Sequence, residues 1–247
     1  MIKLDKFAIA KNVHKMKWND EPYIIRNVLK NPEDIITEQD KLNIFSESPE
    51  FSILTKDREK HRQRHLSTVV NEEVRADKLK KTLEVLNEDV DTVNITEVED
   101  YVPNVKKLCE MLAGIFLCEG EKSINTAHLY VGRKDSKSFL PHLDVPNNFI
   151  FQLEGKSEVI VYRQRGSQLL SCQDFQETKI ENFHTILNEH LEPVIHEELH
   201  PGDMVYIPSR QIHYFNAITD RMSISIPMMG TQGFYGHQPH LVTHNEY

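Results

Sequence analysis

Two residues of the tripeptide His142-Leu143-Asp144 could together hold a metal ion. On a β-strand, positions i and i+2 point to the same face, so this imidazole and this carboxylate can reach one ion. His213 is the best candidate for a third ligand, because it follows a turn, a short apolar strand and a proline stop over residues 201–208. Two histidines and one carboxylate on one face, with open coordination positions, are the ligand set of non-haem Fe(II) oxygenases.

The order of the surrounding elements supports the assignment of these residues as metal ligands. The chain contains 13 histidines, so an isolated His-x-Asp tripeptide is expected by chance. Here the tripeptide lies between predicted strands, and a Pro-Gly-Asp turn and a further strand precede His213. Short runs bounded by turn residues predict strands over residues 126–131, 147–153, 157–162, 203–208 and 221–228.

Several short strands at this spacing favour a sandwich or barrel, and jelly rolls, which include the cupins, are one such fold. We therefore predict a mainly β protein with flanking helices, folded as a double-stranded β-helix. No linker divides the chain, so a mixed α/β region, residues 1–120, should pack on a barrel core with a tail, residues 121–247, as one unit. The N-terminal pattern predicts a strand over 22–26, a helix after Pro32, a charged solvated stretch over 56–67, and helices over 76–88 and 103–118.

A family resemblance covers much of the chain. The matching pieces are Leu129-Tyr130-Val131, Ser136, Phe139, Pro141-His142-Leu143-Asp144, residues 149–155, residues 161–163, residues 199–208 and His213. They resemble the core of the JmjC-type ribosomal oxygenases, which are cupin-fold enzymes that use 2-oxoglutarate to hydroxylate ribosomal proteins. The resemblance implies a JmjC-like fold, Fe(II) held by His142, Asp144 and His213, and 2-oxoglutarate and O2 as co-substrates.

One position departs from the family pattern. Members place a lysine or arginine fifteen residues after the first histidine, to bind the distal carboxylate of 2-oxoglutarate, and this chain has Ser157 there. A serine hydroxyl can donate a hydrogen bond but cannot neutralise a carboxylate. Lys156 is adjacent, but a regular strand would point it the other way. The alternative is Arg221 with Ser223, since other 2-oxoglutarate enzymes place an arginine shortly after the second histidine, although Arg221 could simply be an exposed arginine at a strand end.

The same matching gives three further candidates for contacts with the co-substrate or substrate. Asn148 lies six positions after His142 and on its face, where a related asparagine hydroxylase has an asparagine near the metal. His128 and Tyr130 lie on the strand before the ligands, where the family has cofactor-facing and substrate-facing residues. Each of the three could instead be a polar barrel residue with no role in the site.

The end of the chain also departs from the family. Ribosomal oxygenases continue into a helical dimerisation region and a winged-helix domain, whereas this chain ends soon after Met229. The ribosomal substrate is therefore not carried over, and the substrate could be a side chain in a peptide or protein, or a free amino-acid-like molecule. We expect a homodimer that pairs through its sheets, as short jelly-roll proteins often do.

Composition excludes several other classes of protein. The formal net charge of −9 gives no basic footprint for nucleic acid. No apolar run reaches the roughly 18 residues that a membrane span needs, and the lysine-rich N-terminus lacks a secretory signal. The three cysteines, Cys109, Cys118 and Cys172, form no CxxC pair, which favours free thiols in a cytoplasmic protein.

Two other interpretations compete with the oxygenase. The segment His196-Glu197-Glu198-Leu199-His200 matches the HExxH motif of zinc peptidases, but that motif needs a helix, and Pro201-Gly202 follows at once. We expect a strand there instead, with these side chains on a solvated face. An iron cupin that uses O2 without 2-oxoglutarate, or a non-catalytic metal-binding or ligand-binding cupin, stays open because a fold alone does not fix a function.

Overall fold

Two antiparallel sheets form the body of the computed structural model, which describes residues 2–14, 21–47, 51–55, 90–117, 123, 126–136, 141–144, 146–165 and 191–229. The major sheet has seven strands in the order β1-β8-β5-β10-β4-β3-β2, and the minor sheet has three in the order β7-β6-β9. The strands of the major sheet are β1 (Tyr23–Ile25), β8 (Met204–Ile207), β5 (Asn147–Glu154), β10 (Arg221–Met228), β4 (His128–Gly132), β3 (Val90–Thr96) and β2 (Phe51–Thr55). Those of the minor sheet are β7 (Pro193–Leu199), β6 (Ser157–Arg165) and β9 (Gln211–Ala217).

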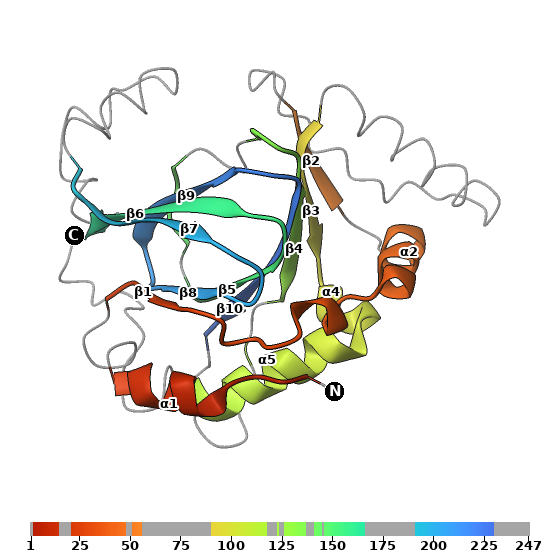
Figure 1. The fold of residues 1–247 in the computed structure, drawn as a ribbon, viewed down its shortest axis with the longest axis horizontal. Coiled ribbons are helices and arrows are strands. Elements are labelled where there is room, and N and C mark those ends of the chain that lie inside the picture. The colour runs from red at the N-terminus through yellow and green to blue at the C-terminus, as the bar shows by residue number, and fades with distance from the viewer. Residues whose placement is uncertain are drawn as a thin grey trace.

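The two sheets face each other and enclose a barrel, while the helices lie on one side (Figure 1). The helical elements are α1 (Lys6–His14), the 3-10 turn η2 (Pro32–Asp34), α2 (Glu38–Glu47), α4 (Val98–Tyr101) and α5 (Pro103–Phe116). This arrangement confirms the predicted double-stranded β-helix with flanking helices. Because β1, β2 and β3 come from the first 120 residues, the N-terminal region supplies strands to the barrel as well as packing on it.

Alternation along the strands of the major sheet separates two environments. One face is apolar and packs with α5, whose buried side chains are Val105, Leu108, Leu112, Ala113 and Phe116. Phe149 of β5 and Tyr206 of β8 lie on this face, with ring centroids 5.1 Å apart, and Phe116 packs 4.4 Å from Phe149. Residues of opposite parity therefore face the barrel interior, and this alternation is what directs Asn148, Ser223 and Ser225 inward.

Several predicted elements match the structure, and one differs. The strand over 22–26, the helix over 103–118 and the five C-terminal strands are present, with boundaries shifted by at most a few residues. After Pro32 only the 3-10 turn forms, and α2 begins later at Glu38. There the amide of Asp40 donates to Thr37 Oγ1 (3.2 Å) and the amide of Thr37 donates to Asp40 Oδ2 (2.9 Å), a capping box that fixes the true start.

The predictions for residues 56–67 and 76–88 fall outside the described residues. Among the described residues, no helix has the length and apolar character needed to cross a bilayer.

Candidate metal centre

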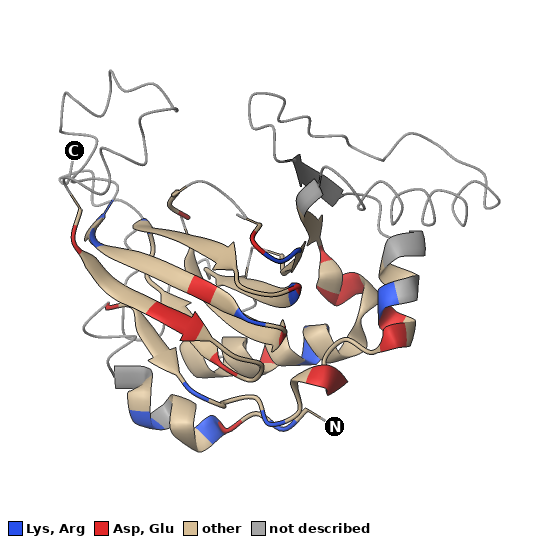
Figure 2. Ribbon diagram, turned by 45° about the horizontal axis from the view of Figure 1, so that its top comes forward, with Lys and Arg blue, Asp and Glu red and all other residues tan. Residues whose placement is uncertain are grey.

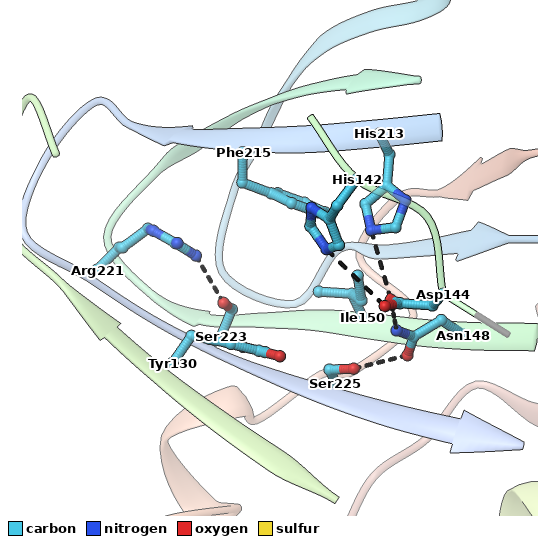
Figure 3. A pocket seen from close by; sticks show the side chains of 10 residues that line it. All are labelled: Tyr130, His142, Asp144, Asn148, Ile150, His213, Phe215, Arg221, Ser223 and Ser225. Atoms are coloured by element: carbon cyan, nitrogen blue, oxygen red, sulfur yellow. Dashed lines mark hydrogen bonds and ion pairs between the residues drawn. The ribbon is translucent and has the colours of Figure 1, made fainter. Parts of the chain in front are cut away.

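His142, Asp144 and His213 come together at one end of the barrel interior (Figure 3). One ligand atom from each residue lies within 4.8 Å of the others. Asp144 Oδ2 is 3.6 Å from His213 Nε2, and Asp144 Oδ1 is 3.9 Å from His142 Nε2. These separations are too long for hydrogen bonds but suit three donors that share one ion at about 2.0–2.2 Å each.

Backbone hydrogen bonds fix the loop that carries the first two of these residues. The amide of His142 donates to the carbonyl of His213 (3.1 Å), and the amide of His213 donates back to the carbonyl of His142 (2.9 Å). The amide of Arg210 donates to the carbonyl of Asp144 (2.6 Å). The loop is therefore held against β9, so that residues 71 positions apart in sequence face each other across the site.

Side-chain hydrogen bonds orient two of the donors. Nδ1 of His213 lies 2.9 Å from the carbonyl oxygen of Gln211, which can only accept, so the proton is on Nδ1 and the lone pair is on Nε2. The amide of Asn148 donates to Asp144 Oδ2 (2.9 Å), and the hydroxyl of Ser225 donates to Asn148 Oδ1 (2.6 Å). Such outer partners are a regular feature of protein metal sites.

The charge states of these groups also suit a metal. Burial, with the nearby His142, lowers the pKa of His213 to about 4, so the imidazole is neutral at neutral pH although Asp144 opposes the shift. Burial alone would raise the pKa of Asp144, but His213, His142 and the Asn148 hydrogen bond outweigh it and hold that pKa below its usual value. A neutral imidazole and an ionised carboxylate are the forms that coordinate a cation. The residues present therefore fit a divalent first-row metal.

A pocket extends from these three residues into the barrel. Its lining consists of Tyr130, His142, Asp144, Asn148, Ile150, His213, Phe215, Arg221, Ser223 and Ser225. Arg221 enters from the side opposite Asp144 and His213 (Figure 3). It is only 4% exposed, and its Nη1 donates to the hydroxyl of Ser223 (2.7 Å). Burial lowers the pKa of Arg221 to about 10, with Tyr130 opposing the shift, so the guanidinium is charged at neutral pH.

The sequence candidates divide into two groups. Asn148, Tyr130, Arg221 and Ser223 line the pocket with the three metal-ligand candidates. Burial, with the negative charge of Asp144, raises the pKa of Tyr130, so its hydroxyl stays protonated. His128 is outside the lining; its ring lies 6.4 Å from the ring of Tyr130, and burial lowers its pKa.

Ser157 and Lys156 also lie outside the lining of the pocket. Ser157 is fully buried, and its hydroxyl donates to Gln152 Oε1 (2.9 Å). Lys156 points away from the interior, as strand parity predicts, and its Nζ pairs with Glu198 Oε1 (2.7 Å). The position at which the family pattern has its cation is therefore occupied by a short side chain that does not reach the pocket.

Three lining residues were not among the site candidates: Ile150, Phe215 and Ser225. Strand parity could have found them, because Ile150 is two residues after Asn148, Phe215 is two after His213, and Ser225 is two after Ser223. Ile150 and Phe215 give the pocket its apolar wall.

The HExxH segment is a strand, as expected. His196 lies on β7 with Nε2 2.7 Å from Glu158 Oε1, and its side chain is 61% exposed. His200, just after the strand, pairs with Glu198 Oε1 (2.9 Å). Figure 2 shows acidic and basic positions close together on this part of the fold. These histidines belong to surface ion pairs and contribute nothing to the pocket.

Comparisons with known proteins agree with this geometry. A model of the JmjC domain family matches residues 101–233. The bifunctional lysine-specific demethylase and histidyl-hydroxylase NO66 of Drosophila willistoni is 26% identical over 136 residues, which cover 55% of this chain and 16% of that protein. NO66 of Dictyostelium discoideum is 30% identical over 135 residues, which cover 55% of this chain and 24% of that protein. The match thus spans at most about a quarter of these relatives.

Solved structures show the same fold. The ribosomal oxygenase YcfD from Escherichia coli in complex with cobalt and 2-oxoglutarate superposes with a TM-score of 0.60 at 17% identity. YcfD in complex with cobalt and succinic acid gives 0.61 at 18% identity. Each alignment covers 95% of this chain and 53% of the YcfD chain, so this chain spans about half of YcfD.

Proposed function

This chain belongs to the JmjC domain family, and on that premise we propose that it is an Fe(II)-dependent and 2-oxoglutarate-dependent oxygenase that hydroxylates an amino-acid side chain. The observation that carries the proposal is one pocket with two ends, a set of two histidines and one carboxylate at one end and the buried cation of Arg221 at the other. A metal chelator with a distal carboxylate needs both ends. The names of the relatives, histidyl-hydroxylase and ribosomal oxygenase, support the same reaction class.

In this proposal His142, Asp144 and His213 hold the iron. When bound, Fe(II) supplies the redox chemistry by which O2 converts 2-oxoglutarate to succinate and CO2 while a C–H bond becomes C–OH. The contribution of the protein is to present a neutral Nε2 from His213, which its Nδ1 bond to Gln211 secures, and a carboxylate that Asn148 holds in place. Three protein donors leave positions for the co-substrate and O2.

Arg221 is our candidate for the residue that binds the distal carboxylate of 2-oxoglutarate. A buried carboxylate is costly without a charged partner, and a guanidinium can meet it with two parallel hydrogen bonds. Ser223 already orients the Nη1 edge of Arg221, and the protonated hydroxyl of Tyr130 lies in the same lining as a further donor. Ile150 and Phe215 supply the apolar part of the lining.

The substrate can be proposed only as a chemical class. The family supports a side chain in a peptide or protein ahead of a free amino-acid-like molecule, and the exposed Leu143, beside two of the proposed ligands, offers an apolar contact at the site.

We further propose that the protein works as a homodimer in the cytoplasm. Light scattering that gives twice the chain mass of 28.8 kDa would support the dimer, whereas a single 28.8 kDa species would contradict it.

A turnover assay for succinate tests the proposed function. With Fe(II) and O2, the protein should release succinate only when 2-oxoglutarate is present, and release should rise when the substrate is added. Oxidation of a substrate without 2-oxoglutarate would instead establish an iron cupin dioxygenase. Metal binding without any turnover, across a broad panel of peptides and amino acids, would favour a non-catalytic cupin.

A further inference from the structure

Gly132 lies beneath the guanidinium of Arg221. The two residues are direct partners in the pairing of β4 with β10, and Gly132 is also the partner of Thr92 on β3. All three positions have the parity that faces the barrel interior. A methyl group added to Gly132 would lie 3.2 Å from Nε of Arg221, 3.0 Å from Oγ of Ser136 and 3.3 Å from Oγ1 of Thr92.

Gly132 is the last residue of β4, where it pairs with two strands but offers no side chain to pack. Gly132 is not one of the glycines with positive φ, which are Gly155 and Gly202 among the described residues. Its backbone would therefore accept an ordinary side chain. What a side chain would lack is space, since each of the three contacts would be tighter than an ordinary van der Waals contact and the neighbouring side chains, Arg221 among them, would have to shift by a few tenths of an ångström.

The neighbours of Gly132 are polar in a buried region. Thr92 is fully buried and Ser136 is 2% exposed, and neither hydroxyl has a hydrogen-bond partner among the described residues. Leaving a buried hydroxyl unpaired is unfavourable, and both oxygens lie at the same place above Gly132 as Nε of Arg221. Neither Thr92 nor Ser136 lines the pocket, so their hydroxyls are placed to hold the guanidinium and not to contact a ligand.

We propose that Gly132 is a positioning residue for the co-substrate, because its missing side chain lets Arg221 lie over β4, flanked by the hydroxyls of Thr92 and Ser136. This inference rests on the proposed function, and it extends it by naming what sets the location of the positive charge. The chain lacks a cation at position 157, and the open face of Gly132 makes room for one at position 221. Gly132 should therefore control selectivity for an oxo acid that carries a second, distal carboxylate.

The test compares binding of 2-oxoglutarate and of 2-oxobutyrate, which lacks the distal carboxylate. Both are titrated calorimetrically into anaerobic, Fe(II)-loaded protein, and iron affinity is measured separately by chelator competition. In Gly132→Ala we expect 2-oxoglutarate to bind about tenfold more weakly or worse, with little change for 2-oxobutyrate and for iron. Gly114→Ala is the matched control, because an added methyl group there meets nothing within 4 Å.

A double-mutant cycle separates positioning from general damage. Gly132→Ala should have no further effect on 2-oxoglutarate binding in an Arg221→Ala background, because its effect acts through the guanidinium. If Gly132→Ala does not fold, Thr92→Val and Ser136→Ala replace it, since they remove hydroxyls without adding volume. Each should reduce the preference for 2-oxoglutarate by about two- to fivefold.

The outcomes distinguish the two proposals. A wild-type protein that binds 2-oxoglutarate strongly, and a Gly132→Ala variant that keeps the same preference, would overturn the role of Gly132 and leave the proposed function intact. Additive losses in the double variant would also overturn it. A wild-type protein that binds neither oxo acid would contradict the proposed function, and the role of Gly132 with it.

Discussion

The barrel interior has two halves of opposite character. Between β5, β8, β6, β7 and β9 it is filled by a cluster of buried apolar residues, namely Ile150, Val159, Val161, Leu199, Val205, Ile207 and Phe215. Across β4 and β10 the same interior carries Tyr130, Arg221, Ser223 and Ser225. The pocket runs along the boundary, so that Ile150 and Phe215 belong to both the apolar cluster and the pocket lining.

This difference separates stability from chemistry inside one barrel. Apolar residues that bury their surface stabilise the fold, at roughly 25 cal/mol per Å² removed from water. Buried polar groups stabilise little, and an isolated buried arginine is costly. A sequence that keeps a buried cation and three serine or tyrosine hydroxyls on one side of its core therefore devotes that side to a ligand. The two halves should accordingly respond to substitution in different measurements.

The largest expected effect is loss of the metal. His142→Ala, Asp144→Ala and His213→Ala should each lower Fe(II) affinity by more than about 100-fold, because removing a ligand exceeds the 10–100-fold loss typical of an outer partner. Isothermal titration under anaerobic conditions measures the affinity, and circular dichroism should show that the barrel stays folded. His196→Ala and His200→Ala are matched controls that should leave iron binding unchanged. Loss of iron in His200→Ala but not in His213→Ala would refute the assignment.

A pair of substitutions tests the division between the halves directly. Leu199→Ala, at a fully buried position in the apolar half, should lower the free energy of unfolding by about 2–5 kcal/mol and leave iron affinity nearly unchanged. Ser225→Ala, in the polar half, removes the hydrogen bond to Asn148, which in turn holds Asp144. It should cost about 1 kcal/mol of stability but weaken iron binding by up to about tenfold. Chemical denaturation measures the stability of both variants, and metal titration measures their iron affinity. If Leu199→Ala weakens iron binding more than Ser225→Ala does, the division between the two halves is wrong.

Arg221→Ala should raise the KM for 2-oxoglutarate about tenfold to a hundredfold, the size expected for losing a charged hydrogen-bond partner of about 1.5–3 kcal/mol. Iron affinity should change little, because Arg221 is not a ligand. Lys156→Ala is the control, since Lys156 pairs with Glu198 outside the pocket. Steady-state kinetics in which Lys156→Ala is the impaired variant would place the cation at Lys156, just before β6. If neither variant changes the KM, an iron cupin that does not use 2-oxoglutarate becomes the favoured function.

Much of the fold could be predicted from local patterns in the sequence. Strand β10 alternates clearly in sequence, β5 contains the apolar run Phe149-Ile150-Phe151, and α5 has its apolar residues at helical spacing after Pro103. Strands β2 and β3 were not predicted, although Val93 and Ile95 alternate with Thr92 and Asn94. The alternation is short and lies beside long charged stretches, so it does not predict a strand by itself. The pairing of β3 with β4 is what establishes the strand.

The candidate site divides in the same way. The pairing of His142 with Asp144 could be predicted from their spacing, although the structure holds them in a loop with a single bridge from His142 to His213 and not on a strand as expected. The outward direction of Lys156 follows from strand parity. The burial of Arg221 does not, because whether a residue at a strand end is exposed depends on the neighbouring strands. Likewise, Gly132 has no significance in the sequence until β3, β4 and β10 lie side by side.

The smallest effect that we predict is a change of stability with pH in the metal-free protein. The pKa of His213 is lowered to about 4 by burial and by His142, whereas an exposed histidine titrates near 6.5. Between these pH values the unfolded chain binds a proton at His213 that the folded chain does not. The free energy of unfolding should therefore fall as pH decreases from 6.5 towards 4, by about 1–3 kcal/mol from this residue.

Urea denaturation of the metal-free protein at several pH values measures this slope. His213→Gln should flatten it in this window, while the exposed His196→Ala should not. In the wild-type protein the contribution of Asp144, whose pKa lies below its usual value of 3.8, is lost only at still lower pH. An equal slope in wild type and His213→Gln would mean that the fold does not keep His213 neutral. Burial would then not be the reason that this imidazole is in the form that coordinates a metal.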